Sequence, residues 1–436
     1  MKPYLPNPHY LEFRGQPRLL IGSGEHYGAV LNADFDYVPY IETLAHHDLN
    51  QVRIFSGTYR ERPGDFGIAT NTLAPLPGHF ICPWVEAAPE TFDLTQFNPA
   101  YFARLKDFLR RASAAEIAVE LVLFCFWYSP DFWTHSPMHP ARSLQGIGPT
   151  DKELVYTLGD NPLLPVQEAF VRKIVAEVNE FDNVYFEVCN EPYSRHDHTF
   201  YLDWQHHIAE VIAEMERGLP NKHLVAINYH NRTFCIPEVH PAVSILNFHY
   251  ALPEAVKSNR HFNRPIADDE TGFQGQTAAP YRKEAWNFFF AGGAVFSHLD
   301  YGFTCEYPDG SAPLAGNTPG YGGDDLRQQL VFLRHFLEEN QVWRLRPANE
   351  LFAQIFGTLP GQALCDPGKT YLLYFPENSP GRAVALWLPV GEFHLEWVNP
   401  TGCRITHTET ITNPGAFLRL ITPDCADDLA LKMTRL

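Results

Sequence analysis

Two glutamates stand at the ends of apolar runs that have the length and composition of buried strands. Glu191 lies in the segment 184–192, VYFEVCNEP, where Pro192 must end a strand because proline cannot donate a ladder hydrogen bond. Glu270 lies in the segment 264–272, RPIADDETG, and a glycine follows it closely. Two carboxyl groups that face each other across a reacting bond can act as a general acid and as a nucleophile or base. The elements that carry these glutamates decide whether they can meet.

Short apolar runs alternate with segments of helical period along most of the chain. Eight runs qualify as strands, at residues 18–23, 50–55, 117–124, 183–188, 223–228, 243–248, 265–268 and 294–298. Apolar stripes predict helices between most of them, such as the stripe from Phe102 to Ala112 after an Asn98-Pro99 start signal. Repeated strand–helix units predict a parallel sheet, and eight of them favour an α/β fold closed as a (β/α)8 TIM barrel. Both glutamates then lie at C-terminal strand ends, on the fourth and seventh strands, where barrel active sites are built.

After Arg346 the alternation of strand-like and helical segments ends. Segments that read as strands, separated by Gly, Pro and Asn, lie at residues 351–356, 370–375, 382–388, 392–398, 403–411, 415–421 and 428–434. This pattern predicts an all-β module, most simply a sandwich. We therefore expect a (β/α)8 catalytic barrel over residues 1–346 and a β-sandwich accessory domain over 347–436 that braces it. A hairpin between Tyr10 and Leu20 should pair with the barrel floor or with the β module.

Two long irregular segments, 126–164 and 299–325, follow the third and eighth strands. Long loops in compact domains are commonly functional lids. Here they could close a pocket, which would favour attack on chain ends, or wall an open cleft.

The barrel and its two glutamate segments resemble clan A of the glycoside hydrolases, the cellulase-like barrels related to family 5, over residues 10–345. In that clan an Asn-Glu-Pro on strand 4 carries the acid/base, and a glutamate that ends strand 7 is the nucleophile. The resemblance implies that Glu191 is the acid/base and Glu270 the nucleophile of a retaining hydrolase of β-glycosidic bonds. It also implies that Asn190 contacts the sugar 2-hydroxyl and that Arg53, on strand 2, supports the nucleophile and keeps it ionised. No cofactor or metal is implied.

Double displacement sets conditions on these carboxyl groups. The retaining reaction places them about 5–5.5 Å apart. Glu191 needs a raised pKa, which we expect from partial burial and from the charge of Glu270. Asp269 is the rival nucleophile, although strand alternation should leave only one of Asp269 and Glu270 facing the barrel interior. Glu187, further down the same strand as Glu191, is expected to make a structural hydrogen bond inside the barrel.

Further residues near strand ends are candidates for substrate binding, namely His249, Tyr250, Glu25, His26, Trp127, Trp133 and Asp300. The clan often has His-x-Tyr at strand 6, where this chain has the adjacent pair His249-Tyr250, so either residue could contact the nucleophile. Strand 8 usually ends in Trp in the clan, whereas this chain reads SHLDY.

The other candidates each have a plainer alternative role. Glu25 and His26 end strand 1 and could serve the loop instead of the substrate. Trp127 and Trp133 could stack on sugar rings or pack inside the lid. Aromatic residues make up 14% of the chain, more than a core of branched aliphatics needs, so some could line a pocket.

Composition excludes several classes of partner. The formal net charge is -18 and there is no basic cluster, which argues against nucleic acid and anionic membranes. No run of about 18 apolar residues could span a membrane. The N-terminus lacks the apolar run of a signal peptide, which favours a cytoplasmic location. Eight scattered cysteines without a C-x-x-C pair are expected to be reduced core thiols, and the expected partner is a carbohydrate.

Two other classes remain open. A metal-dependent amidohydrolase barrel would place ligands such as His26, His230, His249 and Asp300 at strand ends, although it would also need a His-x-His on strand 1. A carbohydrate-binding pseudoenzyme would have no use for both glutamates. The sequence indicates neither the sugar nor the oligomeric state.

Overall fold

The computed structural model describes residues 1–25, 27–159, 161–194, 197, 199–230, 234–353, 355, 357–377, 380–415, 417–424 and 427–436. Eight parallel strands form its central sheet, in the spatial order β4-β13-β12-β11-β10-β9-β8-β5. The strands are β4 Leu20–Gly24, β5 Gln51–Phe55, β8 Ala118–Cys125, β9 Val184–Asn190, β10 Val225–Asn228, β11 Ile245–Phe248, β12 Ile266–Thr271 and β13 Val295–Leu299. All eight predicted strands are present, and the (β/α)8 barrel is confirmed.

Asn50 joins the first and last strands of this order. Its backbone N–H donates to the carbonyl of Ile21 at 3.2 Å, and its side-chain oxygen accepts from the Ile21 N–H at 2.8 Å. Its amide nitrogen donates to the carbonyl of Leu19 at 2.8 Å. The Asn50 side chain thus provides hydrogen bonds between β4 and β5, which are not paired by a backbone ladder, and so closes the barrel.

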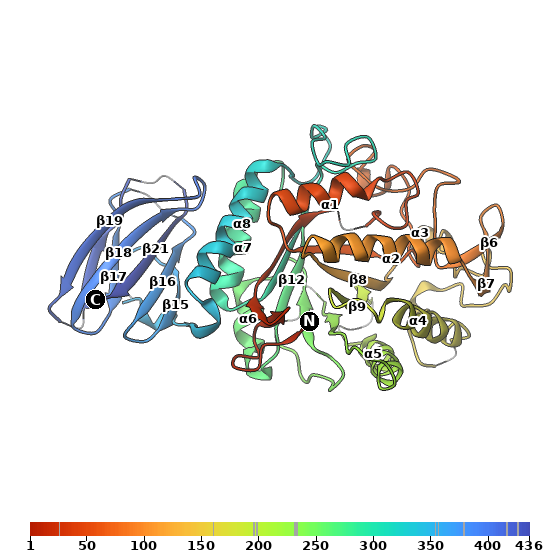
Figure 1. Cartoon of the computed structure of the whole chain (residues 1–436), viewed down its shortest axis with the longest axis horizontal. Coiled ribbons are helices and arrows are strands. Elements are labelled where there is room, and N and C mark those ends of the chain that lie inside the picture. The colour runs from red at the N-terminus through yellow and green to blue at the C-terminus, as the bar shows by residue number, and fades with distance from the viewer. Residues whose placement is uncertain are drawn as a thin grey trace.

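Helices surround the barrel, as Figure 1 shows. They are α1 Tyr37–His46, α2 Pro99–Ala114, α3 Pro130–Thr134, α4 Leu164–Val178, α5 Leu202–Glu216, α6 Pro253–Asn259, α7 Ala278–Ala291 and α8 Asp324–Glu339, with short 3-10 turns at Asp65–Gly67, Lys152–Leu154, Arg260–Phe262, Val342–Arg344 and Asn349–Leu351. The predicted start of α2 is confirmed, because the Asn98 side chain accepts from the Ala100 N–H and Pro99 occupies the first turn.

The interior of the barrel is polar below the active site, where a barrel core is usually aliphatic. Gln51 donates to Glu120 at 3.2 Å, and the Tyr185 hydroxyl donates to the same carboxyl at 3.0 Å. Burial and the charge of Asp269 raise the pKa of Glu120 well above its ordinary value. We infer that Glu120 stays protonated, which lowers the charge held inside the barrel.

The N-terminal segment packs under the barrel. It forms a three-stranded sheet of β1 Lys2–Pro3, β2 Leu11–Phe13 and β3 Gln16–Arg18. Arg14 pairs with Asp182, just before β9, and the Leu19 N–H donates to Glu338 of α8. Of the two predicted placements of the hairpin, pairing with the barrel floor is the observed one.

The C-terminal module lies beside α7 and α8 (Figure 1). Its strands are β14 Arg346–Pro347, β15 Gln362–Asp366, β16 Thr370–Phe375, β17 Ala383–Trp387, β18 Gly391–Asn399, β19 Arg404–Asn413, β20 Phe417–Ile421 and β21 Leu429–Arg435. A six-stranded antiparallel sheet, β14-β15-β16-β21-β18-β19, is accompanied by the pair β17-β20. The predicted β module is confirmed, while its boundary at residue 346 stays a prediction.

One predicted strand of this module is wrong. The segment 351–356 makes a turn and one isolated bridge, from Phe352 to Leu386, and residues 354 and 356 lie outside the described part of the chain. Strand β15, which sequence patterning missed, takes the place beside β16. A hairpin of β6 Trp84–Ala88 and β7 Thr91–Phe97 between β5 and α2 was also not predicted.

Two further predictions concern the cysteines and membrane-spanning helices. The predicted core thiols Cys125 and Cys189 are buried, and every cysteine that the structure describes is free. Within the described residues, no helix combines the length and the apolar character needed to cross a membrane.

A buried ion pair connects the two parts of the chain and predicts a stability effect. Arg282 of α7 donates to Asp428 at 2.8 Å, and both side chains are almost fully buried. Replacing Arg282 with Met leaves a buried carboxylate without its cation, so the free energy of unfolding should fall by about 3–5 kcal/mol. Denaturant titration measures this loss. Lys283→Met is the control, because its pairs with Glu377 and Asp427 are partly exposed and should contribute less than about 1 kcal/mol. Equal stability of Arg282→Met and wild type would contradict the assigned role.

Candidate active site

Arg53 of β5 lies at the centre of the candidate site and is completely buried. Its guanidinium donates to Glu270 at 2.9 Å, to Glu187 at 2.8 Å and to the side-chain oxygen of Asn190 at 2.7 Å. Residues predicted from strands 2, 4 and 7 therefore meet at one cation. Glu187 makes the structural contact inside the barrel that was expected of it.

Asp269 also reaches this guanidinium, at 3.7 Å, although it is the immediate neighbour of Glu270. The expectation that only one of the two faces inward is wrong. The register between β12 and β13 shifts between Asp268 and Thr271, so regular alternation ends there. Asp269 lies fully buried behind Glu270, which leaves Glu270 as the carboxylate at the cavity.

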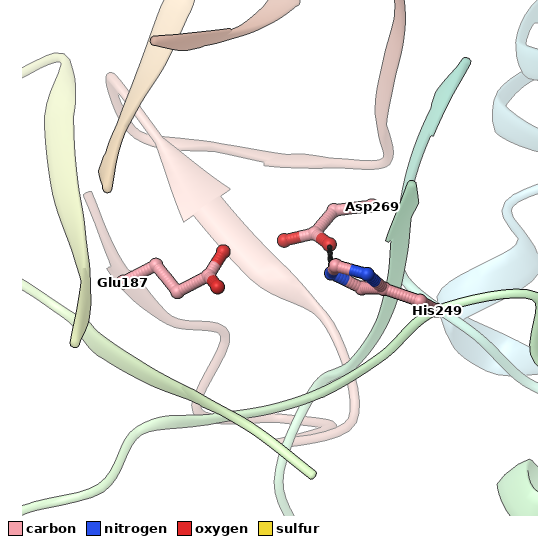
Figure 2. Close-up of side chains that lie close together, drawn as sticks. All are labelled: Glu187, His249 and Asp269. Atoms are coloured by element: carbon pink, nitrogen blue, oxygen red, sulfur yellow. Dashed lines mark ion pairs between the residues drawn. The ribbon is translucent and has the colours of Figure 1, made fainter. Parts of the chain in front are cut away.

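His249, directly after β11, links this buried layer to the acid/base candidate. Its Nδ1 lies 2.8 Å from Glu191 and its Nε2 lies 3.1 Å from Asp269. Figure 2 shows the imidazole against Asp269, with the Glu187 carboxyl opposite. A neutral imidazole has one N–H and cannot donate to both carboxylates. The neighbouring charge of Glu270 and the hydrogen bonds to Asp269 and Glu191 raise the pKa of His249 well above its ordinary value, against the effect of burial.

Glu191 receives three hydrogen bonds and is 6% exposed. The hydroxyls of Tyr128 and Tyr193 each donate at 2.8 Å, and His249 provides the third donor. Burial raises the pKa of Glu191, but these donors lower it further than burial raises it. The expected raised pKa of Glu191 is therefore wrong, because the three donors could not be foreseen from the sequence. We infer from these opposite shifts that Glu191 rests as a carboxylate and His249 as an imidazolium with both ring nitrogens protonated.

Glu270 faces Glu191 across the cavity. One carboxylate oxygen of each, together with His249 Nδ1, lie within 4.8 Å of one another. Burial raises the pKa of Glu270, and the charges of His249 and Arg53 oppose that rise. The Tyr250 hydroxyl donates to Glu270 at 3.3 Å, while His249 lies 3.8 Å from it. The adjacent pair thus divides its contacts, with Tyr250 on Glu270 and His249 on Glu191.

Two of these residues have a left-handed backbone, which costs a non-glycine residue about 1–3 kcal/mol. The φ angle is 44° at Glu191 and 52° at Tyr250. The Glu191 N–H donates to the Asn228 side chain at 3.1 Å, and the Tyr250 N–H donates to the Glu270 carbonyl at 3.2 Å. These hydrogen bonds stabilise the left-handed backbone at both residues, whose side chains line the cavity.

The carboxylates face a cavity of about 490 Å³ with a largely aromatic lining. The aromatic members are Tyr27, Phe55, Tyr59, Phe66, Tyr128, Tyr193, Tyr250, Phe273, Tyr301 and Phe303. Trp127 and Trp133 are not among them, since both are buried and pack on each other with ring centroids 4.3 Å apart. Of their two predicted roles, packing inside the lid is the observed one.

The remaining predicted residues fall in different places. Glu25 lines the cavity, and its carboxyl accepts the N–H groups of Tyr27 and Gly28 at 2.7 Å. Asp300 also borders the cavity, but its carboxylate is bound by Arg327 at 2.8 Å, which indicates a structural role in place of the predicted substrate contact. His26 lies outside the described residues.

Of the four candidate ligands of a metal-dependent hydrolase, the three that the structure describes make other contacts. Asp300 is paired with Arg327, and His249 is paired with two carboxylates. His230 packs against the Tyr193 ring, with centroids 4.6 Å apart. The acidic groups near His249 lie instead against Arg53 and the His249 ring, which provide their positive partners.

The sequence matches neither a protein-family model nor a curated protein. Solved structures match the fold. A family 5 glycoside hydrolase from Bacteroides vulgatus has a TM-score of 0.65 at 14% identity, over 98% of this chain and 92% of that one. The fold is that of the clan A, cellulase-like barrels. A structure described as a glycoside hydrolase has a TM-score of 0.64 at 13% identity, over 98% and 95% of the two chains. The endo-1,4-β-mannanase of Rhizomucor miehei reaches 0.53 at 12% identity, over 76% and 98%.

The contacts of His249 predict an imidazolium that persists at neutral pH. Because its pKa is raised, the ring should keep both protons above pH 6.5 and lose the second only at higher pH. NMR of histidine-labelled protein measures this titration, with the His249→Asn variant identifying the signal. Asp269→Asn removes one of the two carboxylates and should lower the pKa of the ring. A ring that titrates below pH 6.5 would contradict the predicted imidazolium.

Proposed function

We propose that this chain is a retaining hydrolase of β-glycosidic bonds, with Glu191 as acid/base and Glu270 as nucleophile. The observation that carries the proposal is the pair of facing carboxylates at the C-terminal ends of β9 and β12, with one oxygen of each within 4.8 Å of the other. Oxygens this close are compatible with the carboxyl separation of about 5–5.5 Å used for direct attack on the anomeric carbon, whereas inversion needs carboxyl groups about 6.5–9.5 Å apart to admit a water. The cellulase-like fold, the description of the neighbouring structures as glycoside hydrolases and the carbohydrate-sized aromatic cavity support the same activity.

In the first step, Glu270 attacks the anomeric carbon while Glu191 donates a proton to the glycosidic oxygen. The C–O bond breaks, the aglycone leaves as an alcohol, and a glycosyl ester forms on Glu270. Arg53 and Tyr250 orient the attacking carboxylate through their hydrogen bonds. The proton comes from the shared Glu191–His249 pair, so the imidazole supplies it to Glu191 as the leaving group departs. Water then cleaves the ester, and Glu191 takes its proton.

The aglycone should lie on the side of Glu191, since that residue protonates the leaving oxygen. A second cavity of about 640 Å³ adjoins this side and shares Tyr128 and Tyr193 with the first. Its other lining residues include Pro130 and the segment 150–153. This cavity gives the leaving part of the substrate a path away from the reaction centre.

The opposite end of the main cavity is walled by two loops that Asn71 fastens together. Its amide donates to the carbonyls of Tyr301 and Pro313 at 3.0 and 3.2 Å. Its oxygen accepts from Ala315 N–H at 3.1 Å and from the Thr318 hydroxyl at 3.0 Å. A wall at the glycone end leaves little room for a continuing chain, so we propose exo action on short β-glycosides.

The two glutamates predict distinct chemical rescues. Hydrolysis of aryl β-glycosides should fall by about 10²–10⁴-fold in Glu191→Ala and at least as far in Glu270→Ala. Azide needs no general base, so it should rescue Glu191→Ala and give a β-glycosyl azide. With the nucleophile absent, azide can attack directly, and Glu270→Ala should give the α-glycosyl azide. Product analysis by NMR measures both outcomes.

Two controls accompany this experiment. Glu42→Ala, on the exposed face of α1, should leave the rate unchanged. A chelator should have no effect, whereas a metal hydrolase would lose activity. If both glutamate variants keep the wild-type rate, the site assignment is wrong. If the wild type binds glycosides without cleaving them, the chain is a binding protein.

Exo action predicts the first product of a short oligosaccharide. For a β-linked tetrasaccharide of the accepted sugar, the wild type should release monosaccharide from the earliest time point, because the loops joined by Asn71 wall the proposed glycone end. Chromatography of early samples measures the product ratio. Asn71→Ala loosens the wall and should add disaccharide to the early products. Early disaccharide and trisaccharide from the wild type would contradict exo action.

A further inference from the structure

The glycone end of the cavity contains acidic groups that the proposed reaction does not use. Glu25 and Glu61 both line it, from the end of β4 and the loop after β5. Glu25 is held in place by two backbone N–H groups, one on each carboxylate oxygen. Glu61 accepts from the Tyr59 hydroxyl at 3.2 Å. Each oxygen of these carboxyl groups has a second lone pair, so both can still accept hydrogen bonds from a ligand.

Tyr301 provides an independent sign that this wall binds a ligand. Its side chain is 3% exposed and lines the same cavity. Its hydroxyl has no hydrogen-bond partner within the described part of the chain. Burial raises the pKa of this hydroxyl, and the charges of Glu270 and Glu61 raise it further. A buried hydroxyl without a partner is costly, and a ligand in the cavity would supply the missing bond.

The charge of the cavity limits what that ligand can be. Among the described lining residues there is no Arg, Lys or His, whereas Glu25, Glu61, Glu191 and Glu270 all contribute carboxyl groups. Burial raises the pKa of Glu25 to about 7 and that of Glu61 to about 8. Both groups are therefore partly protonated at neutral pH, and a protonated carboxyl can donate to a hydroxyl as well as accept from one. An added anion would find no cationic side chain among these lining residues and would lie close to the Glu270 carboxylate.

We propose that Glu25, Glu61 and Tyr301 recognise the free hydroxyls of a neutral terminal sugar and exclude glycones that carry a carboxylate, sulfate or phosphate. This inference rests on the proposed function, since it takes the walled end of the cavity as the glycone subsite. It adds a substrate class, because it separates neutral glycosides from uronides. It also assigns binding roles to Glu61 and Tyr301, which lie outside the catalytic pair.

Binding of free monosaccharides tests the proposal without requiring turnover. Saturation-transfer NMR with the wild-type protein should detect at least one of D-glucose, D-mannose, D-galactose and D-xylose, and should not detect D-glucuronate. Glu61→Gln should weaken the binding of that neutral sugar about tenfold, because it removes a charged or shared-proton acceptor. Tyr301→Phe should weaken it about threefold and should leave folding intact, because the hydroxyl has no partner among the described residues. Glu42→Gln, on the surface of α1, is the matched control and should leave the affinity unchanged.

The outcomes separate this inference from the proposed function. Equal binding of D-glucuronate, a preference for D-glucosamine, silence of every neutral sugar, or unchanged affinity in both variants would overturn the inference. Hydrolysis of aryl glycosides could still stand in each of those cases. Sugar binding that fails in Glu61→Gln, in a protein that cleaves no glycoside, would overturn the proposed reaction and support the recognition site.

Discussion

The site depends on one buried cation. The Arg53 guanidinium has no access to solvent and lies within 4 Å of four carboxyl groups, those of Glu120, Glu187, Asp269 and Glu270. Buried carboxylates are costly unless they are paired and hydrogen-bonded, so strands β8, β9 and β12 can bring their acids together only because β5 supplies this cation. The same contacts aim Glu270 at the cavity and hold Asn190 beside Glu191.

The single charge of Arg53 does not neutralise four carboxyl groups, and two other features of the site reduce the remaining negative charge. His249 provides a second positive charge between Glu191 and Asp269. Burial and the charge of Asp269 raise the pKa of Glu120, and we infer that this carboxyl stays protonated and adds no negative charge. On these shifts Glu191, the proposed acid/base, rests ionised, and the proton that it would donate lies on His249. Catalysis in this account includes a short transfer from imidazole to carboxylate, driven by the developing negative charge on the leaving oxygen.

The positions of the strands could be predicted from sequence because a parallel barrel buries both faces of each strand, which gives continuous apolar runs. The ends of those runs then located Glu191 and Glu270, while Arg53, in the middle of its strand, and the role of Asn190 came from the resemblance to the clan. Contacts made by loops could not be predicted in this way. The donors Tyr128 and Tyr193 reach Glu191 from segments without periodicity, and nothing in their spacing distinguishes Tyr128 from the buried Trp127 beside it. The shift in register after Asp268 has no sequence signal either. Regular strand alternation therefore predicted, wrongly, that Asp269 and Glu270 could not both face the barrel interior.

The central claim is that Glu270 forms a covalent bond to the sugar, and trapping that bond tests it most directly. A 2-deoxy-2-fluoro β-glycoside with an activated leaving group slows both steps, because the fluorine destabilises the oxocarbenium-like transition states, and the good leaving group allows the ester to accumulate. Mass spectrometry of the intact protein should then show one added fluoroglycosyl group. After digestion, the label should lie on Glu270 in the segment IADDETG. A label on Asp269, or full turnover of ordinary aryl glycosides by Glu270→Ala, would contradict the account.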